Sequence, residues 1–150
     1  MSESINEFRG GYRFLSNFYL CPIVFEGDLY ASVEHAFQAA KTLDPAERKT
    51  VRLCVKPGDA KRAGRKVKKR DDWDDIRVSV MRELLYQKFN SSPLRQRLLN
   101  TGIDELIEGN DWGDVFWGVC RGRGENWLGK LLMEVRALAA TQATAGGGSE

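Results

Sequence analysis

The sequence predicts a mainly α-helical fold of the α+β kind, with a few short strands. Apolar residues recur at helical spacing along most of the chain, and capping residues separate the successive segments. The 150 residues, of which 42% are hydrophobic, are sufficient for one hydrophobic core. We therefore expect one compact domain over residues 1–140 and a disordered tail over residues 141–150, which are small, polar and glycine-rich.

Composition narrows the class of protein. The chain contains no run of eighteen apolar residues, so we expect a cytoplasmic protein without a membrane span. Cys21, Cys54 and Cys120 lack the paired spacing of a zinc or disulfide framework and are interpreted as reduced thiols. With a single histidine in the chain, we expect no metal and no cofactor.

The first predicted elements form a hairpin followed by a helix. Residues 22–26 and 29–30 are predicted strands on either side of a turn at 26–28. Ser32 is a candidate N-cap for a helix from Val33 to about Leu43. A second helix is predicted after Asp44-Pro45, and a third after residues 57–59, continuing through a basic run.

The remaining elements are helices and an aromatic loop. A long helix begins after Asp71 or Asp72 and extends to about Phe89, and a shorter one follows Ser92-Pro93. Residues 105–108 are a predicted strand. Residues 109–126 combine glycines with aromatic residues, which predicts an ordered loop. A final amphipathic helix is predicted from 127 to 140.

One helix face carries side chains that could perform acid–base chemistry. Glu34 and Lys41 are seven positions apart, close to two helical turns, and Gln38 lies between them. A carboxylate, an amide and an amine on one face could supply a general acid or base, an orienting group and a nucleophile. His35 points about 100° away from Glu34 and is interpreted as a structural or capping group.

The aromatic loop could bind a nucleotide. Trp112 and Trp117 offer flat stacking surfaces, and Asp114 between them could stabilise positive charge at an anomeric carbon. Residues 122–126 precede a helix whose free backbone N–H groups could bind phosphate. Each of these patterns also occurs in loops that have only a structural role.

Several separated motifs resemble the NADAR family. They are Phe14-Leu15-Ser16-Asn17-Phe18, the ten residues from Ser32 to Lys41, Trp112 to Gly118, and Gly124 to Gly129, within a likeness that covers roughly residues 8–138. The resemblance implies a compact, mainly helical fold and hydrolysis of N-glycosides.

The resemblance also implies a set of site residues. It places Glu34, Lys41 and Asp114 in catalytic positions. One route has Lys41 attack the anomeric carbon, whereas the other uses water activated by Glu34. The expected substrate-binding residues are Arg13, Asn17, Phe18, Gln38, Trp73, Trp112, Trp117, Gly118 and Asn126.

Three functions follow from the resemblance. The favoured substrate is ADP-ribosylated guanine, with ADP-ribosylated DNA as a candidate partner, because seven of the ten residues from Lys61 to Arg70 are Lys or Arg. The alternatives are an N-glycosidase acting on phosphoribosylaminopyrimidine intermediates of riboflavin synthesis and a noncatalytic module that binds ADP-ribose or NAD. A solvated helix face would also explain the basic run.

Overall fold

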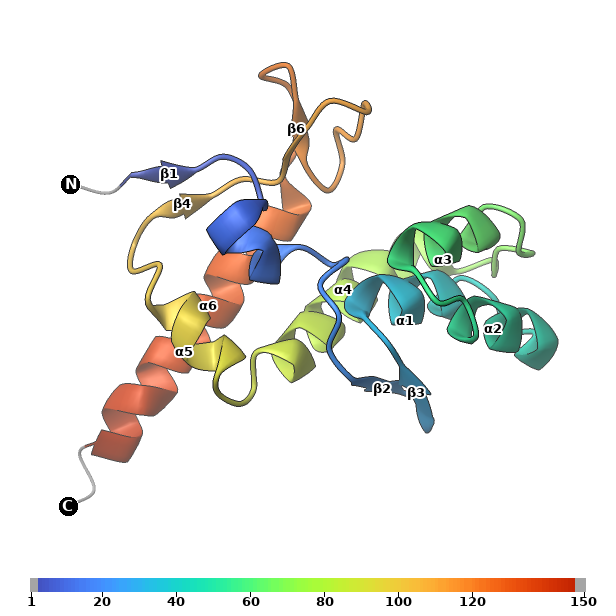
Figure 1. The fold of residues 1–150 in the computed structure, drawn as a ribbon, viewed down its shortest axis with the longest axis horizontal. Coiled ribbons are helices and arrows are strands. Elements are labelled where there is room, and N and C mark those ends of the chain that lie inside the picture. The colour runs from blue at the N-terminus through green and yellow to red at the C-terminus, as the bar shows by residue number, and fades with distance from the viewer. Residues whose placement is uncertain (1–2, 148–150) are drawn as a thin grey trace. The chain divides into compact units, whose positions relative to one another are not determined.

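The computed structural model describes residues 3–147, with side chains to residue 143. The chain packs as two compact units, one formed by residues 1–16 and 89–150 and the other by residues 17–88 (Figure 1). Helices dominate both units and the strands are two or three residues long. The predicted fold class is therefore confirmed.

The unit of residues 17–88 begins with the predicted hairpin. Strands β2 (Ile23–Phe25) and β3 (Asp28–Tyr30) pair antiparallel, with Ile23 opposite Tyr30. Helix α1 (Val33–Ala40) follows, and the Ser32 hydroxyl accepts the His35 backbone N–H, as predicted for an N-cap. Every residue of α1 is buried, so this helix forms the centre of the unit.

Helices α2 (Pro45–Arg52), α3 (Pro57–Gly64) and α4 (Trp73–Lys88) all pack against α1 (Figure 1). Helix α1 ends at Ala40, earlier than expected, because Thr42 already accepts the Asp44 N–H of the next cap. Helix α3 ends at Gly64, so the predicted helix through the whole basic run is wrong. The Arg70 N–H donates to the Lys41 carbonyl at 2.7 Å and thereby holds the run's end in a non-helical path.

The unit of residues 1–16 and 89–150 is built on helix α6 (Trp127–Gly147). Strand β4 (Glu105–Leu106) and helix α5 (Leu94–Leu99) pack on α6, and β4 pairs in parallel with β1 (Ser4–Ile5). The other elements of the unit are the 3-10 helix η1 (Gly10–Leu15) and the parallel pair β5 (Gly109–Asn110) and β6 (Val119–Cys120).

The C-terminal helix is longer than predicted. It continues to Gly147, whereas we expected disorder from residue 141. Residues 141–147 include two alanines, which favour helix, and the Thr141 hydroxyl bonds back to the Ala137 carbonyl at 3.0 Å. The last three residues of the predicted tail lie outside the described residues.

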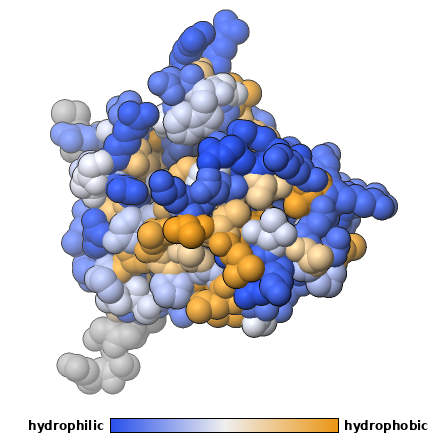
Figure 2. All heavy atoms as spheres, turned by 45° about the vertical axis from the view of Figure 1, so that its right-hand side comes forward, coloured by the Kyte–Doolittle hydropathy of each residue, from blue (hydrophilic) through white to orange (hydrophobic). Residues whose placement is uncertain are grey.

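Among residues 3–147, no helix is both long and apolar enough to cross a membrane. Hydrophilic residues cover much of the face to which α2 and α3 belong, although hydrophobic patches interrupt them (Figure 2). Charged side chains from the basic run contribute to this surface, since Arg62, Arg65 and Lys66 are exposed.

Candidate active site

The polar stripe of α1 holds a buried carboxylate in a fixed position. Gln38 Nε2 donates to Glu34 Oε1 at 2.8 Å, and the two side chains are 5% and 7% exposed. The Glu34 backbone N–H donates to the Asn17 carbonyl at 3.1 Å, which ties the first turn of α1 to the preceding segment. The predicted proximity of Glu34 and Gln38 is therefore present in the structure.

Gly64 allows Gln38 to occupy this position. A Cβ atom at residue 64 would lie 2.0 Å from Gln38 Oε1 and 2.9 Å from Gln38 Cβ. Any side chain at residue 64 would therefore push against the body of Gln38 as well as its tip. The sequence contains no local signal for this contact, because Gly64 and Gln38 belong to different helices.

Lys41 follows the last residue of α1 and has an altered amine. Burial lowers the pKa of Lys41 below its ordinary value, and the neighbouring Glu34 carboxylate opposes this change. Three cations of the basic run, Lys69, Arg65 and Lys61, lower the Lys41 pKa further. A lowered pKa increases the fraction of neutral amine, which is the form that nucleophilic attack requires.

Asn17 and Phe18 lie at the N-terminal side of the same unit. The Asn17 side chain is buried, and among the described residues its Oδ1 has no hydrogen-bond partner. Phe18 is 37% exposed, and Lys61 Nζ lies 5.9 Å from its ring centroid. An exposed ring and an unused acceptor are compatible with the substrate-binding roles predicted for these residues.

Trp73, which was expected to bind substrate, is a buried residue of the interface between α4 and α1. Its indole is 4% exposed and contacts the Phe37 ring with centroids 5.0 Å apart. Trp73 therefore packs α4 against α1 and supports the helix that carries Glu34. Its predicted contact with a substrate base stays a prediction.

The structural interpretation of His35 is confirmed. Its Nε2 lies 2.9 Å from the Cys54 carbonyl, and its Nδ1 lies 2.7 Å from the Ser32 hydroxyl. A carbonyl can only accept, so Nε2 must carry the proton, while Nδ1 accepts the Ser32 O–H. Both ring nitrogens therefore connect α1 to its surroundings.

The acid and aromatics of the late loop belong to the other unit. Asp114 Oδ1 accepts the backbone N–H groups of Phe116 and Trp117 at 3.1 and 2.9 Å. The Trp117 ring meets the Phe116 ring edge-on with centroids 4.9 Å apart. Asp114 thus has a clear structural function in folding the loop, and its catalytic role stays a prediction.

Gly118 and Asn126 also hold this loop together. A Cβ atom at Gly118 would lie 2.2 Å from the Glu108 carbonyl oxygen. The Asn126 amide donates to the Leu106 carbonyl at 2.9 Å and accepts the Glu108 N–H at 3.0 Å. Their predicted substrate contacts are untested. Arg13 in η1 and Trp112 in the loop were also expected to bind substrate, and both are exposed.

Within the described part of the chain, no group of three or more His, Cys, Asp and Glu side chains could hold a metal ion. Polar side chains on and beside α1 include the Glu34 carboxylate, the Gln38 amide and the Lys41 amine. These are groups that can perform acid–base and nucleophilic chemistry.

The chain belongs to the NADAR family, whose domain matches residues 6–138. It is 38% identical to the N-glycosidase YbiA of Escherichia coli over 135 residues, which are 87% of this chain and 84% of that protein. The NMR structure of E. coli YbiA covers 96% of this chain and 89% of its own, with 36% identity and a TM-score of 0.83.

A second group of relatives is larger. A riboflavin biosynthesis protein of Vibrio vulnificus is 42% identical over 127 residues, covering 82% of this chain. The chain spans 34% of the length of that protein. Membership of the family and the names of the N-glycosidase relatives support an enzyme that cleaves N-glycosidic bonds.

Proposed function

We propose that this protein removes ADP-ribose from ADP-ribosylated guanine by cleaving the N-glycosidic bond. The observation that carries the proposal is the lowered pKa of the half-buried Lys41, to which burial and the charges of Lys69, Arg65 and Lys61 contribute. The same cations would attract the two phosphates of ADP-ribose toward an amine that is already poised to react.

The proposed reaction begins with attack by the neutral Lys41 Nζ on the anomeric carbon. A new C–N bond forms while the electrons of the bond to guanine pass to the base, which takes up a proton. Glu34 accepts the proton that Nζ loses and returns it to the leaving base. The ribose ring then opens to an imine on Lys41, and water hydrolyses the imine to release ADP-ribose and the amine.

The test compares wild type with Glu34→Gln and Lys41→Ala on ADP-ribosylated guanine DNA, with products identified by mass spectrometry. Wild type should release ADP-ribose, and both variants should lose turnover. Borohydride should trap a reduced adduct on the peptide that contains Lys41. Full turnover by Lys41→Ala without an adduct would instead support water activated by Glu34.

A second candidate substrate is a phosphoribosylaminopyrimidine of riboflavin synthesis. The observation that favours it is the similarity to riboflavin biosynthesis proteins of Vibrio vulnificus and Zea mays. Release of base from this substrate alone, at a rate that salt does not change, would favour the metabolite reaction. Binding of ADP-ribose without any product would favour the noncatalytic module.

A further inference from the structure

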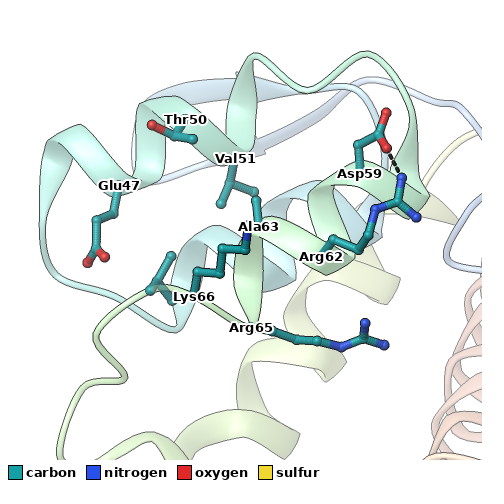
Figure 3. Close-up of a pocket in the computed structure, with 9 residues that line it drawn as sticks. Glu47, Thr50, Val51, Asp59, Arg62, Ala63, Arg65 and Lys66 are labelled. Atoms are coloured by element: carbon teal, nitrogen blue, oxygen red, sulfur yellow. Dashed lines mark hydrogen bonds and ion pairs between the residues drawn. The ribbon is translucent and has the colours of Figure 1, made fainter.

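A cavity of about 630 Å³ lies between α2, α3 and the segment that follows α3 (Figure 3). It is separate from the polar stripe of α1, since it includes neither Glu34 nor Gln38 nor Lys41. The lining combines charged side chains with an apolar surface that makes up most of its area. It consists of Glu47, Thr50, Val51, Asp59, Arg62, Ala63, Arg65, Lys66 and Val67.

The two acids of this cavity are occupied by other groups. Glu47 accepts the Thr42 hydroxyl at 2.6 Å and the Lys68 backbone N–H at 3.1 and 3.2 Å. Asp59 forms an ion pair with Arg62, one turn along α3 (Figure 3). Their negative charges therefore serve the protein's own structure.

The cations are in excess. Among residues 3–147, neither Arg65 nor Lys66 forms an ion pair. The Lys66 side chain extends toward Val51 of α2, whereas Arg65 points away from α2 (Figure 3). Cations beside an apolar surface match a phosphate that is joined to a sugar and a base.

We propose that the cavity between α2 and α3 binds the phosphodiester backbone of a single nucleic-acid strand, with Lys66 contacting a phosphate and the half-buried Ala63 and Val67 contacting the adjoining sugar. The proposal rests on the proposed function, because it supplies the site that would hold the DNA on which the modified guanine is carried. Arg65 belongs to both the cavity and the surroundings of Lys41, since it lines the cavity and its charge lowers the Lys41 pKa.

The test measures fluorescence anisotropy of an unmodified, fluorescein-labelled DNA strand, so binding is observed without catalysis. Lys66→Gln should weaken binding and reduce the slope of log affinity against log salt by about 0.7, the value for one phosphate contact on a single strand. Asp59→Asn should strengthen binding, because it leaves Arg62 without its carboxylate. Lys49→Gln, an exposed α2 lysine outside the cavity, is the matched control and should change neither quantity.

The outcomes separate this proposal from the proposed function. The cavity would be overturned as a nucleic-acid site if Lys66→Gln and Lys49→Gln lost the same affinity for the DNA strand. Binding of polyglutamate as tight as that of the DNA strand would overturn it too. Absence of strand binding by wild type at low salt would also overturn it, even if ADP-ribosylated guanosine were cleaved. If the strand binds in the expected pattern but the modified guanine is not released, the cavity stands and the proposed substrate fails. Cleavage of free ADP-ribosylated guanosine should be the same in Lys66→Gln and wild type.

Discussion

Gly64→Ala is the sharpest perturbation of the candidate active site, because it changes no catalytic group. The added methyl would lie 2.0 Å from Gln38 Oε1 and 2.9 Å from Gln38 Cβ. Moving the amide alone would not relieve the second contact, so the two helices must also separate. Overpacking of this kind costs about 1–3 kcal/mol, which in a protein of this size lowers Tm by about 2–4 °C for each kcal/mol.

The same substitution should also impair turnover. Displacement of Gln38 removes the 2.8 Å hydrogen bond to Glu34, and hydrogen bonds to charged groups contribute about 1.5–3 kcal/mol. If half of that energy is lost from the transition state, kcat/KM falls by roughly four- to thirteenfold. Thermal unfolding and product release from ADP-ribosylated guanine measure the two effects.

Two further variants isolate the cause. Gly58→Ala lies in the same helix with no atom within 4 Å of its new Cβ, so both properties should be retained. Gln38→Ala should recover part of the stability of Gly64→Ala, because the contacts at Oε1 and Cδ disappear while the 2.9 Å contact at Cβ remains, and turnover should stay low. The reasoning is refuted if Gly64→Ala matches wild type in both measurements while Gln38→Ala is impaired.

Three other predictions concern charge, capping and the late loop. Lys41→Met should abolish turnover yet stabilise the fold at pH 7, because the lowered pKa of Lys41 reflects the penalty of burying an ammonium. The gain in stability should disappear as pH rises through 10.5, where the amine of the unfolded chain also becomes neutral. Urea unfolding at several pH values checks this. Ser32→Ala should destabilise the protein by about 0.5–2 kcal/mol through loss of the α1 cap, and an unchanged urea midpoint would contradict that role. Asp114→Asn should keep the loop hydrogen bonds that Asp114→Ala loses. Lost turnover with an unchanged Tm in the Asn variant would show that the Asp114 charge acts in catalysis. Intact turnover in that variant would show that Asp114 has a structural role only.

Local signals in the sequence were sufficient for most of the helices. Ser32 and Asp44 each place an acceptor before a helix, and both accept a backbone N–H in the structure. The parallel pairing of β1 with β4 could not be predicted, because two-residue strands have no periodicity and their partners are about a hundred positions apart. After α3 ends at Gly64, the non-helical path of the basic run includes the Arg70–Lys41 hydrogen bond, which is equally non-local.

The part of the candidate site that depends on local helical spacing could also be predicted. Helical spacing placed Glu34 and Gln38 on one face, and their hydrogen bond follows from that spacing. The basic run was interpreted as a surface for DNA, but its effect on Lys41 depends on the packing of α3 against α1. The burial of Trp73 could not be predicted from the sequence, since an aromatic residue that suits a substrate pocket suits a core equally well.

The hydrogen bonds of His35 have a consequence for kinetic measurements. This is the one histidine of the chain, and its two ring nitrogens are engaged by Ser32 and the Cys54 carbonyl. Because both nitrogens are engaged within the protein, the imidazole is not placed to exchange a proton with a substrate. The proton transfers probed by the Glu34 and Lys41 variants can therefore be assigned to the carboxylate, the amine or the substrate itself.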